Sequence, residues 1–308
     1  MRFWTETGRD DARRTMTRYD WPTLLWGERT ITVLSDGLQR LDGGAMFGVV
    51  PRVLWEKKLQ PDDRNRIRLG MNCLLVDGPE GRTVVEVGAG GKDDAKFQDI
   101  YGLERDGGLP KRLADRGTSP ETVDRVVLTH LHFDHAGGAT TWAEDGKTAV
   151  PTFPNATYCI HRGEFEDAMN PNARNAASYL KRNYAPLEEA DRVRWIEDGD
   201  RLEGIRIFET PGHTRHHVSV GVDDGAGRLV VFLGDLVPTV HHLPDPWIMS
   251  YDLYPVTTLE TKQRFLAQVH DAEWLCAFVH DADYPLAWIE RDNRGRHRRN
   301  EERDPWDV

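Results

Sequence analysis

The sequence predicts an α/β protein in which several strands end in side chains that bind metal ions. Short apolar, β-branched runs bounded by glycine, proline or asparagine recur along the chain, which is typical of buried strands. Residues 109–116 and 257–272 have helical spacing instead, and the first of these helices should end at Gly117. Histidine or aspartate follows four of the apolar runs, so the strands should hold these side chains still.

The N-terminal half begins with residues 1–28, which are polar and aromatic without a clear period. We expect an arm there, packing on a partner subunit. A Gly-Pro-Glu-Gly turn joins the second and third expected strands as a hairpin. A helix near 162–168 should follow the fifth strand. The strands expected in this half cover residues 29–34, 71–77, 82–87, 125–129 and 157–160.

The C-terminal half begins with residues 170–190, which are rich in asparagine, alanine and charge and are expected to form a mobile, helical insertion. The main domain should run from 29 to 290, and residues 291–308 should be a charged, solvated tail with interleaved arginine and acidic side chains. The strands expected here are 192–196, 204–209, 217–222, 228–233, 275–279 and an edge strand at 285–290.

Composition limits the kind of protein. The 308 residues suffice for one large domain or two small ones, and 39% hydrophobic with 30% charged residues is typical of a globular protein. No apolar run approaches the roughly 20 residues that a membrane span needs. The first twenty residues lack the apolar stretch of a secretory signal, so we expect a cytoplasmic protein that does not interact with membranes.

Charge and cysteine content exclude further classes. A net charge of −11 disfavours a nucleic-acid partner, because an acidic chain repels phosphate backbones. The three cysteines, Cys73, Cys159 and Cys276, are odd in number and form no C-x-x-C motif. We therefore expect buried free thiols and neither a disulfide framework nor a thiolate zinc site.

Residues 126–138 read VVLTHLHFDHAGG and carry the strongest functional signal. His130, His132, Asp134 and His135 follow an apolar strand, and two glycines close the loop. A single histidine at a strand end is usually a hydrogen-bonded surface residue, but four ligand-type side chains in six positions indicate a metal site. Imidazole nitrogens and carboxylate oxygens suit Zn²⁺, and also Mn²⁺, Fe²⁺ or Co²⁺.

Three later strand ends supply further ligands. TPGHT contains His213, VVFLGD ends in Asp235, and LCAFVHD contains His280. Seven ligands are too many for one tetrahedral ion and suit two divalent ions. The first ion is expected to bind His130, His132 and His213, the second Asp134, His135 and His280, with Asp235 bridging them.

The motifs THLHFDH, PGHT, GD and HD, in this order, resemble those of the metallo-β-lactamase-fold hydrolases over about residues 29–290. The resemblance implies a four-layer αβ/βα sandwich with a dinuclear site at one edge of its sheets. Zinc β-lactamases themselves place a cysteine where Asp235 stands, so antibiotic hydrolysis is not expected. The family usually carries aspartate where this chain has Glu86, which leaves open whether Glu86 supports the site. His217 is expected to support the metal ligands by hydrogen bonding.

Residues 43–55, GGAMFGVVPRVLW, resemble the N-terminal region of the lactonase and organophosphate-hydrolase branches, which include the N-acyl-homoserine lactone (quorum-quenching) lactonases. There this region forms an apolar loop near the active site. An aromatic-rich segment further on is expected either to line the same pocket or to pack in the core or a dimer interface, and two histidines either face the substrate or lie in a surface loop. The pocket candidates are Met46, Phe47, His241, His242, Trp247, Met249 and Tyr251.

These features predict a hydrolase that opens lactone or ester bonds in a small-molecule substrate by attack of a hydroxide bridging the two ions. Asp134 is the candidate that carries a proton to the leaving group. A phosphotriesterase or promiscuous esterase, and a metal-binding relative without lactonase activity, stay open as alternatives. Glyoxalase II is disfavoured because only 28 residues follow His280, and an RNase Z-type activity is disfavoured by the charge. A homodimer is also expected.

Overall fold

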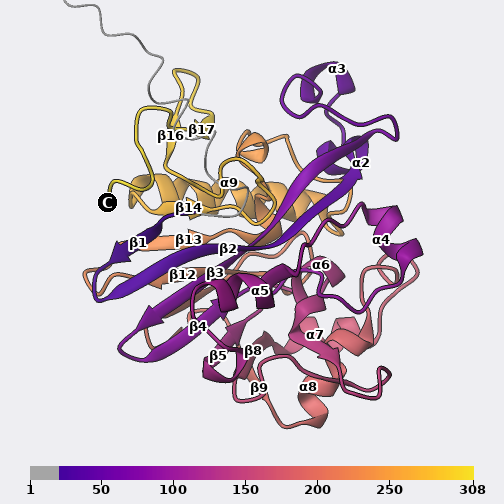
Figure 1. Cartoon of the computed structure of the whole chain (residues 1–308). Coiled ribbons are helices and arrows are strands. Elements are labelled where there is room, and N and C mark those ends of the chain that lie inside the picture. The colour runs from indigo at the N-terminus through magenta and orange to yellow at the C-terminus, as the bar shows by residue number, and fades with distance from the viewer. Residues whose placement is uncertain (1–20) are drawn as a thin grey trace, which may run out of the picture.

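Two β-sheets form the centre of the molecule in a computed structural model that describes residues 21–308 (Figure 1). The first sheet has seven strands in the order β1-β2-β3-β4-β5-β8-β9. Its bounds are Thr23–Trp26 (β1), Arg29–Asp42 (β2), Arg66–Gly78 (β3), Gly81–Val85 (β4), Arg125–Val127 (β5), Thr157–His161 (β8) and Val193–Ile196 (β9). Strands β2 and β3 make a long antiparallel pair with a register shift between Ser35 and Leu38.

The second sheet has six strands in sequence order. Its bounds are Arg201–Leu202 (β10), Ile205–Glu209 (β11), Val218–Asp223 (β12), Leu229–Phe232 (β13), Leu275–Ala277 (β14) and Leu286–Ala287 (β15). Two short hairpins lie outside the sheets: Thr140–Trp142 (β6) with Ala149–Pro151 (β7), and Ile289–Arg291 (β16) with His297–Arg299 (β17). The edge strand expected at 285–290 is therefore divided, and only β15 lies at the sheet edge.

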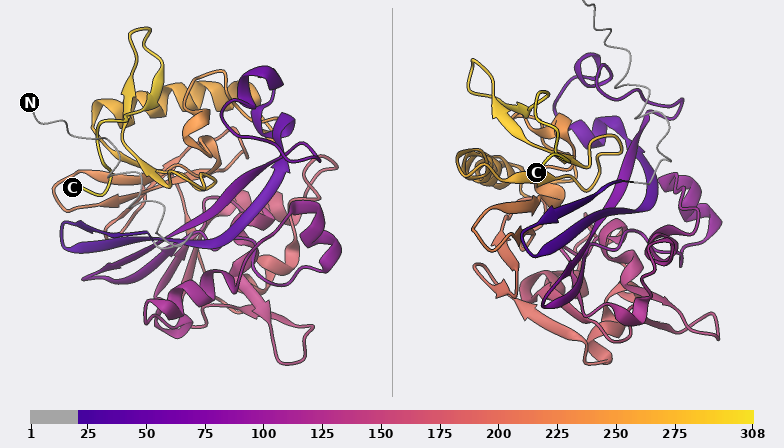
Figure 2. Two further views of the ribbon diagram at one scale, coloured as in Figure 1. Left: turned by 45° about the horizontal axis from the view of Figure 1, so that its top comes forward. Right: turned by 60° about the vertical axis from the view of Figure 1, so that its left-hand side comes forward.

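Helices cover the outer face of each sheet (Figures 1 and 2). The α-helices are Gly43–Phe47 (α2), Arg52–Trp55 (α3), Ala95–Tyr101 (α4), Gly108–Asp115 (α5), Phe133–Ala136 (α6), Arg162–Met169 (α7), Ala185–Glu189 (α8) and Pro255–Asp271 (α9). The 3₁₀ turns are Pro120–Thr122 (η1), Gly137–Ala139 (η2), Lys181–Asn183 (η3), Gly234–Leu236 (η4) and Val240–His242 (η5).

Three buried clusters define the layers. One lies between the sheets and joins residues such as Val127 and Val220. A second packs α5, α7 and α8 on the outer face of the seven-stranded sheet, and a third packs Phe265 and Leu266 of α9 on the outer face of the other. Each sheet alternates its apolar side chains between two buried faces, which is why both read as nearly continuous apolar runs. The predicted four-layer αβ/βα sandwich is confirmed.

Parallel pairing sets the edge at which functional side chains collect. β4, β5, β8 and β9 pair in parallel, and so do β13 and β14. The carboxyl ends of parallel strands meet at one sheet edge, so the loops that follow β5, β13 and β14 start from fixed backbone. The chain therefore brings distant loops together without any of them needing a regular structure of its own.

The two ends of the domain differ from the prediction. The arm expected at residues 1–28 includes β1, which pairs with β2 and buries Leu24 and Trp26 on one face. Residues 1–20 of that arm lie outside the described residues. The charged tail is not simply solvated either. It contains β17, and the Arg303 guanidinium lies 3.8 Å from the ring centre of Trp288. Cation–π contacts of this kind hold arginine-rich segments against a domain.

The expected insertion at 170–190 is helical only in η3 and α8. It is attached to the metal-binding loop by a hydrogen bond from Phe133 N to Ser178 O (2.9 Å). The three cysteines are buried and free, as predicted. Within residues 21–308, no helix is both long and apolar enough to cross a membrane.

Candidate metal centre

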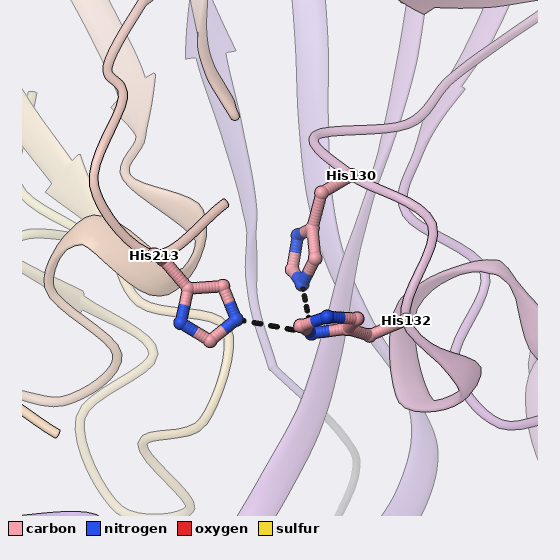
Figure 3. A group of neighbouring side chains, drawn as sticks. All are labelled: His130, His132 and His213. Atoms are coloured by element: carbon pink, nitrogen blue, oxygen red, sulfur yellow. Dashed lines mark hydrogen bonds between the residues drawn. The ribbon is translucent and has the colours of Figure 1, made fainter. Parts of the chain in front are cut away.

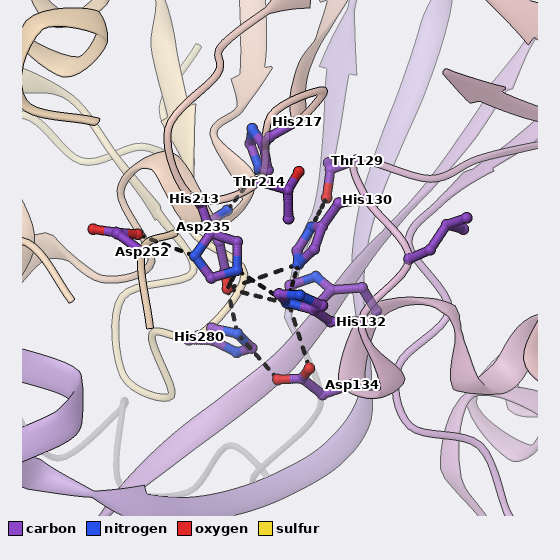
Figure 4. Close-up of polar contacts among 12 residues, drawn as sticks. Thr129, His130, His132, Asp134, His213, Thr214, His217, Asp235, Asp252 and His280 are labelled. Carbon is purple, nitrogen blue, oxygen red and sulfur yellow. Dashed lines mark hydrogen bonds and ion pairs between the residues drawn. The ribbon is translucent and has the colours of Figure 1, made fainter. Parts of the chain in front are cut away.

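All seven predicted ligands come from loops at the same edge of the two sheets (Figure 4). The loop after β5 carries His130 and His132, and the single turn of α6 that follows carries Asp134 and His135. His213 lies in the connection from β11 to β12, Asp235 in η4 after β13, and His280 just after β14. All seven residues are at most 8% exposed, so the site is held inside the protein.

Three imidazole rings form the first group, shown in Figure 3. Nδ1 of His132 lies 3.1 Å from Nε2 of His130 and 3.0 Å from Nε2 of His213. A tetrahedral zinc ion with Zn–N bonds of about 2.0–2.1 Å separates its ligand nitrogens by about 3.3 Å. The spacing of these three nitrogens therefore fits the one ion that the sequence assigned to this group.

The second group consists of Asp134, His135 and His280. Nε2 of His280 lies 3.5 Å from Oδ2 of Asp134, and Nε2 of His135 lies 3.7 Å from its Oδ1. Asp235 stands between the groups: its Oδ2 is 3.2 Å from Nε2 of His213 and its Oδ1 is 3.2 Å from Nε2 of His280. Oδ2 also lies 3.5 Å from Nε2 of His135, so the carboxylate faces both groups, as a bridging ligand would.

Burial and neighbouring charges shift the pKa values of the ligands in different directions. Burial alone would lower the pKa of His135, His213 and His280, but the facing Asp235 carboxylate raises it above the usual value. Burial and the neighbouring imidazoles lower the pKa of His130 and of His132 well below the usual value, so both rings are neutral and keep a free lone pair. Burial alone would raise the pKa of Asp235, but the facing imidazoles lower it well below its usual range. The bridging side chain is therefore an ionised carboxylate.

Buried atoms without partners test whether a metal ion fits. Nε2 of His135 and Oδ1 of Asp235 are fully enclosed, yet neither makes a hydrogen bond to any residue in the described range. Such atoms are rare in folded proteins, because an unpaired buried polar group costs about 1–3 kcal/mol. Asp235 points toward the centre of the cluster (Figure 4), and Nε2 of His135 lies 3.5 Å from its Oδ2, so the side chains present fit divalent cations with nitrogen and oxygen ligands.

Glu86 supports the site in spite of its extra methylene. Its Oε2 accepts a hydrogen bond from Nδ1 of His135 (2.7 Å), and its Oε1 accepts one from Thr129 N (2.6 Å). The backbone of Glu86 is in the left-handed region, with φ of 64°. A carboxylate that orients the far nitrogen of a histidine fixes which ring nitrogen faces the metal. The question that the sequence left open is answered: Glu86 holds His135.

Two further ring ligands, His213 and His280, also have a partner behind the ring. Nδ1 of His213 faces Oδ1 of Asp252 (3.0 Å), and Nδ1 of His280 donates to Gly70 O (2.8 Å). The predicted support from His217 is confirmed, because its Nε2 accepts a hydrogen bond from Asp235 N (3.0 Å). The sequence did not identify Asp252, which follows no strand and matches no ligand spacing.

Two further buried polar side chains were missed. Gln39 of β2 donates from Nε2 to Oδ2 of Asp134 (2.6 Å). Glu164 of α7 accepts hydrogen bonds from Leu131 N and from the hydroxyl groups of Tyr179 and Thr214, and so ties together the loops that carry three of the histidines. Both residues lie outside the ligand motifs, and only their burial in the folded chain shows their role.

A cavity of about 210 Å³ opens above the metal centre. Ligand side chains form its floor, and Leu41, Met46, Phe133 and Met249 form apolar walls. It is smaller than the about 300–1,000 Å³ that is common for drug-sized ligands, so it suits a compact substrate. The full set of lining residues is Leu41, Met46, Tyr101, His132, Phe133, Asp134, Arg174, Asn175, Ser178, His213, Asp235, Met249, Ser250, Tyr251, Leu253 and His280.

Of the expected pocket residues, Met46, Met249 and Tyr251 line this cavity. The others do not line it: Phe47, His241, His242 and Trp247. His242 is fully buried, stacks on Phe47 with ring centres 4.7 Å apart, and donates from Nε2 to Met46 O (2.8 Å). Trp247 packs edge-on against Phe47. These side chains form a core behind Met46 because burial of the aromatic rings outweighs exposure to the pocket.

Comparison with known proteins agrees with this geometry. The family model described as "Metallo-beta-lactamase superfamily" matches residues 67–280, well over half of the chain. The chain belongs to the metallo-β-lactamase superfamily. It is a metal-dependent hydrolase of that superfamily, as predicted, and the matched region begins in β3 and ends at the last ligand, His280.

Relatives within the superfamily include lactonases. The chain is 26% identical to the N-acyl homoserine lactonase AttM of Rhizobium radiobacter over 235 residues, which cover 70% of this chain and 82% of that protein. A probable metal-dependent hydrolase from Staphylococcus aureus has a similar structure, with 28% identity and a TM-score of 0.82, covering 90% of this chain and 99% of that one. AidC, a dizinc quorum-quenching lactonase, shares the fold at 20% identity and a TM-score of 0.77, covering 93% and 98%.

Proposed function

We propose that this metallo-hydrolase opens a lactone or carboxylic ester bond with two divalent metal ions, and that zinc is the metal. The observation that supports this most directly is the placement of Asp235, whose carboxylate faces both ligand groups on the floor of an apolar-walled cavity. The similarity to AttM, which is named as an N-acyl homoserine lactonase, favours lactones among the substrates of this superfamily.

Two ions bound here would supply Lewis acidity and lower the pKa of a coordinated water. The chain itself contributes fixed positions. Asp252 and Glu86 orient His213 and His135, so the ring nitrogens need no rearrangement to bind a cation. Phe133 and the other apolar walls limit the water around the scissile carbonyl, which strengthens electrostatic interactions with its oxygen.

Asp134 is the group we assign to proton transfer. It lines the cavity, and the hydrogen bond from Gln39 holds its Oδ2 at 2.6 Å. A carboxylate fixed in this way is placed to carry a proton to the alkoxide that leaves when the ester or lactone bond breaks. Asp134→Asn should slow substrates with poor leaving groups most; an equal loss for good and poor leaving groups would refute this role.

The proposal is tested by proton release from a panel of N-acyl-homoserine lactones, simple lactones, aryl esters and a phosphotriester, with the zinc-loaded protein. His132→Ala serves as the blank because it removes the ring whose Nδ1 faces Nε2 of both other histidines of the first group. Lactone or ester turnover that is lost in the blank supports the proposal. Turnover of the phosphotriester alone, with two ions bound, would replace it with a phosphotriesterase.

A further inference from the structure

One wall of the cavity comes from the segment between α7 and η3, which carries an arginine to the cavity mouth. Nη2 of Arg174 donates to Ser250 O (2.6 Å) and to Asp252 O (3.2 Å), across the opening from its own backbone. Arg174 is an exposed residue that also lines the cavity. The two carbonyl oxygens therefore fix the guanidinium at the rim instead of leaving it free in solvent.

Arg174 has no acidic partner anywhere in residues 21–308, in a chain with 51 acidic and 40 basic residues. A guanidinium has five N–H donors, and the two bonds from Nη2 leave the Nε and Nη1 donors unused. The carboxylate of Asp252 does not serve as the partner, because its oxygens face Nδ1 of His213 and Met249 N. A fixed, unpaired cation at the entrance is available to an anionic ligand.

The next residue provides an independent observation. Asn175 is only 6% exposed and lines the same cavity. Its Oδ1 is buried without a hydrogen-bond partner, and its Nδ2 also bonds to nothing in the described chain. A buried side-chain amide is normally satisfied, so an unused one beside an unused guanidinium indicates a polar group that the ligand supplies.

We propose that Arg174 and Asn175 bind a carboxylate at the far end of the substrate's acyl chain. This inference rests on the proposed ester or lactone hydrolysis, and it names the substrate class: a short acyl group with its scissile carbonyl at the metal centre and a terminal carboxylate at the cavity mouth. Guanidinium is the side-chain group best matched to carboxylate. With the amide of Asn175 turned so that Nδ2 takes the place of Oδ1, Nδ2 donates to the same carboxylate.

The cavity walls agree with such a substrate. Leu41, Met46 and Met249 line the same cavity as the metal ligands and Arg174, and these apolar side chains suit the methylene groups of a chain. The volume of about 210 Å³ limits that chain to a few carbons, so both polar ends of one compact molecule can be held at once. A neutral acyl chain would leave the Arg174 and Asn175 donors unpaired.

The test compares two esters of equal length, monophenyl hexanedioate and phenyl hexanoate, which differ only in the terminal carboxylate. The zinc-loaded full-length protein should favour the anionic ester by about tenfold or more in kcat/KM, as expected for a charge-assisted hydrogen bond. Arg174→Gln should bring the ratio close to one, and Arg174→Lys should give an intermediate ratio. Raising the salt concentration should also lower the wild-type ratio.

Arg264→Gln is the matched control, since Arg264 is an exposed arginine on α9 outside the cavity lining, and it should leave the ratio as in the wild type. A wild-type ratio near one overturns the inference. So does an equal loss of both activities in Arg174→Gln, which would show that Arg174 only braces Ser250 and Asp252.

A binding measurement separates this inference from the proposed function. If neither ester is hydrolysed, ester hydrolysis is refuted, and calorimetry with hexanedioate and hexanoate then decides the role of Arg174. Tighter binding of hexanedioate that disappears in Arg174→Gln supports the carboxylate site. Equal binding of the two acids by the wild-type protein overturns it.

Discussion

Replacing Glu86 by glutamine tests whether the support behind His135 controls metal binding. Both partners of Glu86 are donors, the Nδ1–H of His135 and the backbone N–H of Thr129. Glutamine has one acceptor oxygen, so whichever way its amide lies, one of these buried donors faces an NH₂ group. Losing a hydrogen bond to a charged group costs about 1.5–3 kcal/mol, which is a factor of about 10–150 in an equilibrium constant. We expect a loss of this size in affinity for the second metal ion.

The assay is competition for zinc against a chelator of known affinity, which resolves a first and a second binding constant. Glu86→Gln should weaken one constant strongly, because the ring of His135 loses its fixed orientation. Glu144→Gln, which removes a carboxylate from an exposed position, should bind both ions as the wild type does. If Glu86→Gln binds two ions with wild-type constants, the carboxylate does not position His135 and our reasoning about this contact is wrong.

Three further changes probe the bridge, the backbone and a buried histidine. Asp235→Asn should leave less than two ions bound after dialysis and lower hydrolysis by at least about 100-fold, because the carboxylate shared by both groups is lost; full activity with two ions would refute the bridge. Gly137→Ala should destabilise the fold by about 1–3 kcal/mol in urea unfolding, since its Cβ would lie 2.0 Å from Ala89 O; unchanged stability would contradict that packing. Burial lowers the pKa of His242 to about 3, from 6.5. Between pH 6.5 and pH 3, His242 is therefore protonated in the unfolded chain and neutral in the folded chain. The free energy of unfolding falls as the pH drops through this range, by about 1.4 kcal/mol per pH unit. His242→Gln keeps a donor for Met46 O and should show a shallower fall in urea unfolding with chelator present; equal slopes would contradict the pKa.

The metal ligands could be predicted from sequence because their spacing is local. His130, His132, Asp134 and His135 lie within six consecutive residues, and His213, Asp235 and His280 each follow a later apolar strand within a few residues. A strand of alternating or continuous apolar residues is visible in the sequence, and the residue at its end inherits a fixed position. The layers followed from the resemblance to a family and not from periodicity alone.

The residues around the ligands could not be predicted in the same way. Gln39 lies on β2, Glu164 on α7 and Asp252 in the loop before α9, and each contacts a ligand segment far away in the sequence. Their polar side chains look like ordinary surface residues until the fold buries them. The ends of the domain were misjudged for a related reason: Leu24 and Trp26 alternate with exposed residues over only four positions, which is too short a pattern to distinguish from an irregular arm.

The floor and the entrance of the pocket are built by different parts of the chain. Its floor is fixed by strand ends, and its entrance is formed by the segment after α7 and the loop at 249–253. Arg174 joins these two entrance segments through the carbonyl oxygens of Ser250 and Asp252, and the side chain of Asp252 in turn orients His213. A ligand that binds Arg174 therefore contacts a segment connected directly to the metal centre. The same arginine is thus placed both to select the substrate and to keep a metal ligand in position, so the two roles have to be separated by the ratio of matched substrates and not by activity alone.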